Sequence, residues 1–276
     1  MVKLSMEAPI SLLFELPYIT DFDFVLTHLC EESNTYLDHY RSMVRSGREV
    51  ILDNSVNELG EPVSLGQMDD VVKVLSPTYI IPPDHLNNLG ATLGIIDDAV
   101  SLWGKGKIWP VIQGTSYDEV VECGKVLKND WGFDTVCIPY DITLAHRSKL
   151  DEGDPNKATL DELSKTRLHA VKALTAEGIA FRRYHLLGMN TLNEFPAYSE
   201  VKTWSSPKYW GGTSPQVSLD TGAPITNAFN NRKFGIDDLV PKGVYFDYFA
   251  GSKILEEAKE TWYWNICMLK GSLDGK

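Results

Sequence analysis

The stretch EVILDNSV, residues 49–56, joins a short apolar run to a polar ending. The run from Val50 to Leu52 is typical of a strand buried on both faces. Asp53 and Asn54 follow it directly. A carboxylate and an amide in this position indicate either a turn or the edge of a binding site at the carboxyl end of a strand.

Seven other runs have the same character, and amphipathic segments lie between them. All eight runs are rich in Val, Ile, Leu and aromatic residues: 22–29, 49–56, 78–84, 108–114, 135–141, 183–189, 216–220 and 243–249. Strands that alternate with helices over about 250 residues are typical of a TIM barrel. We therefore predict an α/β fold, a (β/α)8 TIM barrel, as a single domain with loop insertions over residues 1–276 and a core at about 20–270. A doubly wound open sheet is the alternative, although no Gly-x-Gly-x-x-Gly is present.

Four segments that lie between the runs or after the last run have a helical pattern. They are 64–75, 116–129, 159–178 and 252–271. Ser116 precedes its segment as a candidate N-cap, and Glu119 follows three residues later. This spacing predicts a capping box at the start of that helix.

The composition excludes several classes of function. The chain has 26 Lys and Arg against 38 Asp and Glu, a net charge of −12, so we expect no binding of nucleic acid through bulk charge. The four cysteines are far apart and give neither a zinc site nor a disulfide framework. The N-terminal apolar run is too short and too charged for a signal peptide or a membrane span. We expect a cytoplasmic protein without cofactor or metal.

Polar residues at the ends of the predicted strands form the candidate site, because barrel chemistry lies at the carboxyl ends of strands. Singly, each of them is better explained as a helix cap or a turn residue. Turn chemistry does not explain why apolar strands end repeatedly in Asp or Gln. The residues in question are Asp53, Asn54, Ser55, Asp84, Gln113, Gly114, Gly188 and Asp220.

These side chains suit two chemical tasks. Asp53 and Asp220 are candidates for a nucleophile and a general acid/base, in which one carboxylate attacks the anomeric carbon of a sugar and the other handles the proton of the leaving group. Asp84 and Gln113 complement the edge of guanine. The carboxylate accepts from N1–H and N2–H2, while the amide and the backbone N–H of Gly188 donate to O6.

Five motifs in this order resemble the tRNA-guanine transglycosylase superfamily, and most of all its DpdA-like DNA 7-deazaguanine transglycosylases of phages and bacteria. They are ILDNSVNELGEP, IIPPDH, PVIQG, HLLGMNTLNEF and VSLDTGAPI. The resemblance covers roughly residues 20–250 and lies in the ordered series, since no single motif is specific. It also implies a (β/α)8 barrel.

The resemblance implies a role for each candidate residue. Asp220 is the nucleophile that attacks C1′ and expels guanine, and Asp53 is the general acid/base that deprotonates the incoming 7-deazaguanine. The target base is flipped out of its stack. The set that we predict to bind the base is Asp84, Gln113, Gly114, Leu187, Gly188, Asn54 and Ser55.

The implied substrate is DNA. The tRNA enzymes of the superfamily carry clustered cysteines and a histidine for zinc near the C-terminus, where this chain has only Cys267. The entering base is a 7-deazaguanine such as preQ0 or preQ1. The basic residues that we expect near nucleic acid are Arg147, Lys149, Lys208, Arg232 and Lys233. Solvated loop charges explain them equally well.

Several alternatives stay open at this point. In the first alternative, the chain is a guanine transglycosylase whose substrate is tRNA. In the second alternative, the chain is a non-catalytic barrel that binds a deazaguanine or nucleic acid. A retaining glycosidase would use the same pair, Asp53 and Asp220. A partner protein that opens the duplex, or a homodimer, would reconcile the acidic charge with a DNA substrate.

Overall fold

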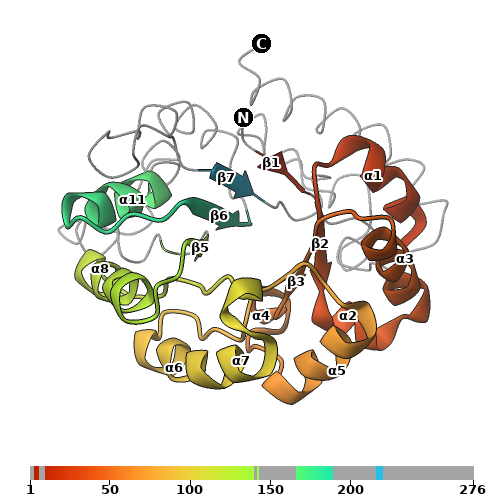
Figure 1. The fold of residues 1–276 in the computed structure, drawn as a ribbon, viewed down its shortest axis with the longest axis horizontal. Helices are drawn as coiled ribbons and strands as arrows, with labels where there is room; N and C mark the ends of the chain where they lie inside the picture. The colour runs from red at the N-terminus through yellow and green to blue at the C-terminus, as the bar shows by residue number, and fades with distance from the viewer. Residues whose placement is uncertain (1–2, 6–9, 140–141, 143–165, 189–215, 220–276) are drawn as a thin grey trace, which may run out of the picture.

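The structure is a computed structural model that describes residues 3–5, 10–139, 142, 166–188 and 216–219. The described residues form two parallel sheets (Figure 1), a four-stranded sheet in the order β1-β7-β6-β5 and a three-stranded sheet in the order β2-β3-β4. The strands are β1 Lys3–Leu4, β2 Asp23–Leu26, β3 Val50–Asp53, β4 Tyr79–Ile80, β5 Thr135–Pro139, β6 Arg183–Leu187 and β7 Gln216–Leu219.

The prediction of an eight-stranded (β/α)8 barrel is wrong for the part of the chain that the structure describes. Six of the eight predicted runs contain a strand there, but these strands belong to two separate sheets and form no closed barrel. The predicted strand at 108–114 forms only isolated bridges, from Ile108 to Ile80 and from Val111 to Cys137. The run at 243–249 lies outside the described residues.

Proline explains where the ladders stop. Pro110 lies in the middle of the run 108–114 and has no N–H to donate, so a continuous ladder cannot form there. Pro82 and Pro83 likewise follow β4 and limit it to two residues. The segment 108–112 still runs parallel to β4 and β5, since both isolated bridges are parallel.

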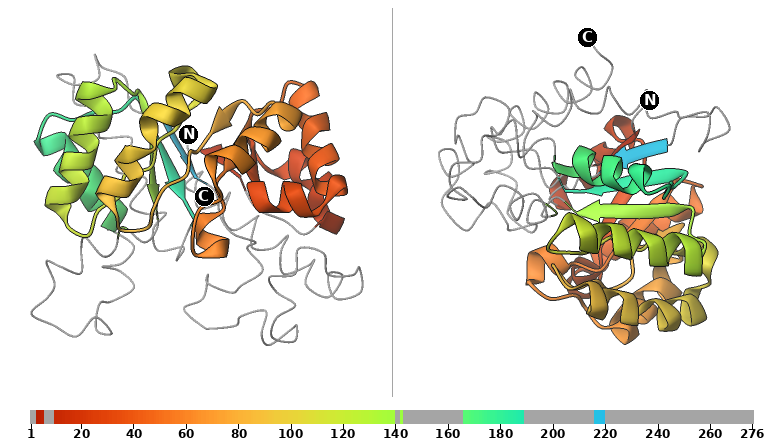
Figure 2. Two further views of the ribbon diagram at one scale, coloured as in Figure 1. Left: turned by 90° about the horizontal axis from the view of Figure 1, so that it is seen from below. Right: turned by 90° about the vertical axis from the view of Figure 1, so that its left-hand side faces the viewer.

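The helices lie outside the strands (Figures 1 and 2), and in Figure 2 the strands β5, β6 and β7 lie side by side with α8 and α11 against them. The α-helices are α1 Leu16–Ile19, α2 Thr27–Glu32, α3 Asn34–Arg45, α4 Val56–Leu59, α5 Leu65–Leu75, α6 Leu89–Gly94, α7 Ile96–Trp103, α8 Tyr117–Lys125 and α11 Thr166–Ala176. Short 3-10 helices, η1 Ile10–Glu15 and η2 Lys105–Lys107, and a π-helical turn, η3 Val126–Asp130, complete the set.

Three of the four predicted helices have a described counterpart, in α5, α8 and α11, while 252–271 lies outside the described residues. Ser116 caps α8 as predicted, since its hydroxyl accepts from the N–H of Glu119 at 3.2 Å. The carboxylate of Glu119 does not complete the box. It accepts instead from the N–H and the hydroxyl of Thr115, at 2.7 and 2.8 Å.

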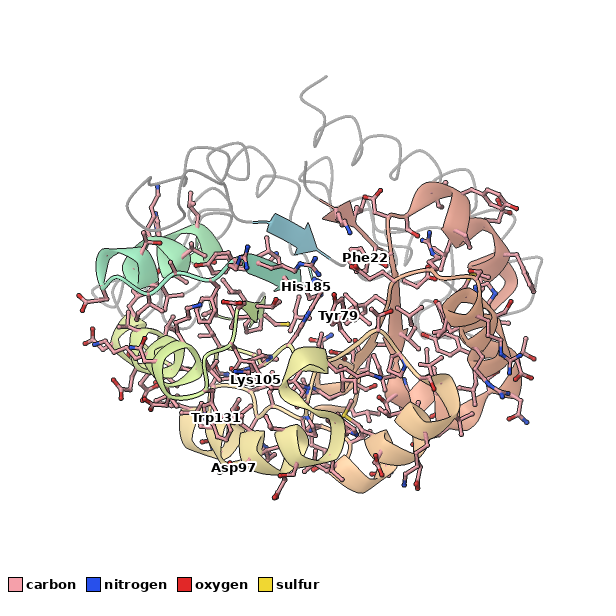
Figure 3. The ribbon with its side chains drawn as sticks, in the orientation of Figure 1. Phe22, Tyr79, Asp97, Lys105, Trp131 and His185 are labelled. Carbon is pink, nitrogen blue, oxygen red and sulfur yellow. The ribbon has the colours of Figure 1, made fainter. Side chains whose placement is uncertain are left out.

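Aromatic side chains fill the space between the two sheets. His185 of β6 is fully buried, and its ring stacks on Phe24 of β2 with 5.6 Å between ring centroids. Phe22 and Trp109 approach the same ring at 5.8 and 5.5 Å. Figure 3 shows His185, Phe22 and Tyr79 in this interior region. The sheets therefore share one apolar core although no continuous ladder joins them.

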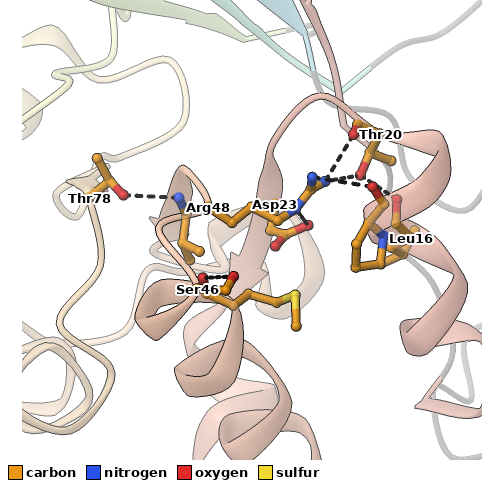
Figure 4. A network of polar contacts seen from close by, with 9 residues as sticks. Leu16, Thr20, Asp23, Ser46, Arg48 and Thr78 are labelled. Carbon is orange, nitrogen blue, oxygen red and sulfur yellow. Dashed lines mark hydrogen bonds and ion pairs between the residues drawn. The ribbon is translucent and has the colours of Figure 1, made fainter.

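A buried ion pair holds the amino-terminal end of β2. Nε of Arg48 lies 2.8 Å from Oδ1 of Asp23, whose side chain is fully buried, and Nη2 of Arg48 donates to the carbonyl of Thr20 at 3.0 Å (Figure 4). Burial raises the pKa of Asp23, and the hydrogen bond and charge of Arg48 oppose that rise. This network ties β2 to the chain on both sides of it.

Within the described ranges, no helix has both the length and the apolar character that crossing a membrane requires. Cys30, Cys123 and Cys137 are buried cysteines that form no disulfide among the described residues. Burial raises the pKa of Cys30 and of Cys123 to about 12. These two thiols therefore stay protonated near neutral pH and are poor nucleophiles.

Candidate active site

The chain turns sharply where β3 ends. The N–H of Ser55 donates to Oδ2 of Asp53 at 2.7 Å, and the N–H of Val56 donates to Oδ1 of Asn54 at 2.9 Å. These are two successive Asx turns, and Ser55 has a left-handed backbone with φ of 63°. Unlike ordinary surface turns, this one is buried, with Asn54 and Ser55 fully covered and Asp53 only 7% exposed.

The start of α2 supports this turn from the neighbouring strand. The hydroxyl of Thr27 donates to the carbonyl of Asp53, and the backbone N–H of His28 donates to the hydroxyl of Ser55 at 3.3 Å. Because α2 begins directly after β2, the parallel pairing of β2 with β3 brings these groups together. The predicted strand 22–29 ends at Leu26, and its last residues hold Asp53 in place.

A buried carboxylate, that of Asp84, lies beside the turn. Oδ1 of Asp84 accepts from Nδ2 of Asn54 at 2.7 Å, and Oδ2 accepts from Nε2 of Gln113 at 2.6 Å. Asp84 and Gln113 are each 2% exposed. The fold thus brings together three of the predicted strand endings, after β3, after β4 and after the segment 108–112.

The orientation of both amides follows from their partners. Asn54 uses its Nδ2 group for Asp84 and for the carbonyl of Pro82 at 2.9 Å, while Oε1 of Gln113 accepts from the N–H of Asn87 at 2.9 Å. A carbonyl accepts only and a backbone N–H donates only, so neither amide can be turned over. Asn54 therefore positions Asp84. Gln113 donates one of its two Nε2 protons to Asp84, and the other proton can be donated to a ligand.

Gly114, predicted to contact the base, lies close to the first turn of α8. A Cβ at this position would lie 2.8 Å from Cβ of Glu119 and 3.0 Å from the backbone nitrogen of Val120. Real Cβ atoms essentially never approach as closely as 2.8 Å. Gly114 is thus needed for the packing of α8 against the residue that follows Gln113.

Leu187 and Gly188 lie at the carboxyl end of β6, in the four-stranded sheet. Gly188 has a left-handed backbone with φ of 63°. Every recorded pairing in and between the two sheets is parallel, so the carboxyl ends of β3, β4 and β6 face the same edge. Gly188 and the Asp84 network therefore belong to the same end of the molecule.

One side chain at this edge was not predicted from the polar residues at the ends of the strands. Arg167, in the first turn of α11, is 1% exposed. Its guanidinium donates to the carbonyls of Leu187 and Gly188, both at 2.9 Å. An arginine in a predicted amphipathic helix is normally interpreted as solvent-facing, so only its position in the fold identifies it.

The remaining predicted site residues lie outside the described residues. They are Asp220, Arg147, Lys149, Lys208, Arg232 and Lys233. The described part of β7 ends at Leu219, the residue before Asp220, and β7 is parallel to β6.

No model of a known protein family matches the chain, and a search of curated proteins gives no match. Among the described residues, no cluster of three or more His, Cys, Asp or Glu could hold a metal ion.

Proposed function

We propose that this chain is a guanine transglycosylase that acts on DNA and exchanges guanine for a 7-deazaguanine base such as preQ0. The observation that carries the proposal is the buried carboxylate of Asp84, held by the amides of Asn54 and Gln113 at 2.7 and 2.6 Å. The fixed carboxylate beside a fixed amide donor offers an acceptor next to a donor. Guanine and 7-deazaguanine carry the complementary pattern, with N1–H and N2–H2 beside O6.

Burial makes this recognition selective. Asp84 and Gln113 are each only 2% exposed, and a base with an acceptor in place of N1–H would set its lone pair against the buried carboxylate of Asp84. Such a mismatch is what lets a polar site reject an analogue by a large factor. The same pocket serves the leaving and the entering base, because both present the same polar edge once the nucleotide is flipped out of the duplex.

The proposed chemistry uses two carboxylates. Asp220 attacks C1′, the bond from C1′ to N9 breaks, and its electron pair leaves with guanine, which takes up the proton of the Asp53 carboxyl group. Asp53 then removes the N9 proton of the entering 7-deazaguanine, whose N9 attacks C1′ and releases Asp220. The Asx turn fixes the side chain of Asp53 through the N–H of Ser55 at 2.7 Å, and a fixed orientation is what a general acid/base requires.

An exchange assay tests the proposal. Labelled 7-deazaguanine is incubated with the protein and with duplex or single-stranded DNA, and incorporation is counted. Asp53→Asn keeps an oxygen that can accept from the N–H of Ser55, so it separates chemistry from folding. It should lower kcat by about 10²–10⁴-fold, and Asp220→Asn should abolish exchange. The control, Asp70→Asn, changes an exposed carboxylate and should keep full activity.

The exchange assay also shows whether DNA or tRNA is the substrate. Parallel assays on DNA and tRNA show which one receives the label, and incorporation into tRNA alone would replace DNA as the substrate. Tight binding of the base without exchange on either polymer would point to a non-catalytic binding protein. Full exchange activity in Asp53→Asn would contradict the role of Asp53.

A further inference from the structure

Thr27, the first residue of α2, binds the main chain of the proposed general acid/base. Its side-chain hydroxyl donates to the carbonyl of Asp53 at the end of β3, 26 residues away in the sequence. Thr27 is fully buried. Burying a hydroxyl costs free energy unless it makes a hydrogen bond, and valine would fill the same space without that cost. Packing alone therefore does not account for a threonine here, whereas the bond to Asp53 does.

The register of β2 and β3 explains why a side chain makes this bond. The parallel ladder of these strands ends with Leu26 opposite Asp53. At its start, the N–H of Asp23 donates to the carbonyl of Glu49 at 2.9 Å, and the equivalent pair at the other end is Thr27 with Asp53. Because Thr27 begins α2, its backbone N–H turns along the helix axis, and it is the hydroxyl that donates to the carbonyl.

The next residue of α2 holds the other side of the same turn. The backbone N–H of His28 donates to the hydroxyl of Ser55 at 3.3 Å, and the N–H of Ser55 donates to Oδ2 of Asp53 at 2.7 Å. Ser55 has a left-handed backbone, with φ of 63°. This conformation costs a residue other than glycine free energy and persists only where the surrounding structure imposes it. The turn that orients Asp53 therefore depends on the bonds from α2.

The residues that bind the base in the proposed function have other supports. Asp84 is held by the side-chain amides of Asn54 and Gln113, at 2.7 and 2.6 Å, and the amide of Asn54 is fixed further by the carbonyl of Pro82. None of these three bonds involves α2. Loss of a bond from α2 would therefore move Asp53 and leave the acceptor for the base in place.

We propose that Thr27 is a positioning residue for Asp53, and that its hydroxyl sets the rate of exchange and not the affinity for the base. This inference rests on the proposed function, in which Asp53 gives a proton to the leaving base and takes one from the entering base. A general acid/base has to stay within hydrogen-bond reach of the atom it serves, and a small displacement lowers the rate by a large factor. Thr27 acts through the main chain of Asp53 and does not touch the base.

Two variants at this position test the inference in the exchange assay. Thr27→Val keeps the shape of the side chain and removes the hydroxyl, so kcat should fall by about 10–100-fold, while calorimetry should show an unchanged affinity for 7-deazaguanine. Thr27→Ser keeps the hydroxyl and should keep the wild-type kcat. Full kcat in Thr27→Val, or an equal loss of kcat in both variants, would overturn the positioning role of the hydroxyl.

The matched control lies at the opposite end of the same strand. The hydroxyl of Thr78 accepts from the N–H of Val50, the first residue of β3, at 3.1 Å (Figure 4). Thr78→Val thus also removes a hydroxyl that binds the main chain of β3, but at the amino end of the strand. It should lower the melting temperature and keep the wild-type kcat. A loss of kcat as large as in Thr27→Val would mean that any loosening of β3 slows exchange, and the inference would be refuted.

A double variant shows whether Thr27 acts through Asp53. In Asp53→Asn the carboxylate that Thr27 positions is absent, so the addition of Thr27→Val should lower the residual kcat no further. A merely structural role would instead lower kcat by the same factor in both backgrounds, and this result would contradict the inference.

Failure of this inference is distinguishable from failure of the proposed function. If Asp53→Asn loses exchange while Thr27→Val keeps it, only the role of Thr27 is refuted. If the wild type incorporates 7-deazaguanine into neither DNA nor tRNA, the proposed function fails, and this inference fails with it. Thr27→Ser decides the case in which Thr27→Val does not fold. Its wild-type kcat would then support the inference, and a kcat lowered by about tenfold or more would contradict it.

Discussion

Gln113 donates from Nε2 to Oδ2 of Asp84 at 2.6 Å and joins two positions 29 residues apart in the chain. Oδ1 of the same carboxylate accepts from Asn54. Both oxygens of Asp84 are thus held by amides whose orientation is fixed by further bonds, to Pro82 and to Asn87. The carboxylate has one geometry, and an acceptor with one geometry can distinguish ligands by their donors.

Asp84→Asn should destabilise the fold and abolish binding of the base. One oxygen becomes an NH2 group that faces the NH2 of either Asn54 or Gln113, so a buried donor is left without an acceptor. The expected loss is about 1–3 kcal/mol in the free energy of unfolding, measured by urea denaturation, with 7-deazaguanine binding followed by calorimetry. Asp70→Asn, at an exposed position, is the control. Unchanged stability would mean that the network is not formed in solution.

Gly114→Ala should destabilise the protein, because its Cβ would lie 2.8 Å from Cβ of Glu119 and 3.0 Å from the backbone nitrogen of Val120. Overpacking of this kind costs about 1–3 kcal/mol. The matched control is Gly106→Ala, since a Cβ at Gly106 meets nothing within 4 Å. Thermal unfolding of the two variants checks the difference, and equal melting temperatures would contradict the close packing of α8.

The local elements could be predicted from the sequence because local chemistry determines them. The buried runs contain β2 to β7, and Ser116 caps α8 as predicted, although Glu119 does not complete the predicted capping box. The prediction of a closed barrel was wrong because hydrophobic runs do not show whether the hydrogen-bond ladders between neighbouring strands are continuous. Pro110 removes a donor from the run 108–114, which keeps only single bridges.

The candidate site was predictable in part. Asp53, Asn54, Asp84 and Gln113 were selected as strand endings. The structure joins Asn54, Asp84 and Gln113 through hydrogen bonds, and it binds the carboxylate of Asp53 separately to the N–H of Ser55. Which of these residues positions another could not be predicted from the sequence. Asn54 supports Asp84 through a hydrogen bond that forms only when the fold brings the two residues together. Arg167 gave no signal in the sequence, since its burial depends on how α11 packs on β5 and β6.

His39→Phe should make stability less sensitive to acid. Burial lowers the pKa of His39 below 6.5, and nearby Arg48 lowers it further. A histidine with a lowered folded pKa contributes stability above its unfolded pKa and loses that contribution as pH falls through the folded pKa. Phenylalanine keeps an edge contact with Phe14, whose ring lies 5.2 Å from that of His39. Melting temperatures between about pH 7 and about pH 5 should fall less in the variant; an equal fall would exclude His39 as a source of acid sensitivity.

Arg48→Met should destabilise the fold strongly at neutral pH. It removes the partner of Asp23, which lies 2.8 Å from Nε of Arg48 and is fully buried. Breaking a buried pair in this way costs about 3–5 kcal/mol. The exposed pair of Arg41 with Asp38, at 3.0 Å, provides the control, because Arg41→Met should cost only about 0–1 kcal/mol.

The pH dependence of Arg48→Met separates the charge from the lost hydrogen bonds. Burial raises the pKa of Asp23 above 3.8, and Arg48 opposes this rise, so the variant should have a still higher folded pKa. A carboxyl with a raised folded pKa stabilises the fold below its unfolded pKa, and the contribution is lost as pH rises through the folded pKa. Without Arg48 this loss extends further toward neutral pH. Urea denaturation at about pH 4 and about pH 7 should therefore show a larger difference between variant and wild type at the higher pH. The same difference at both pH values would mean that Arg48 acts through its bonds to Pro17 and Thr20 alone.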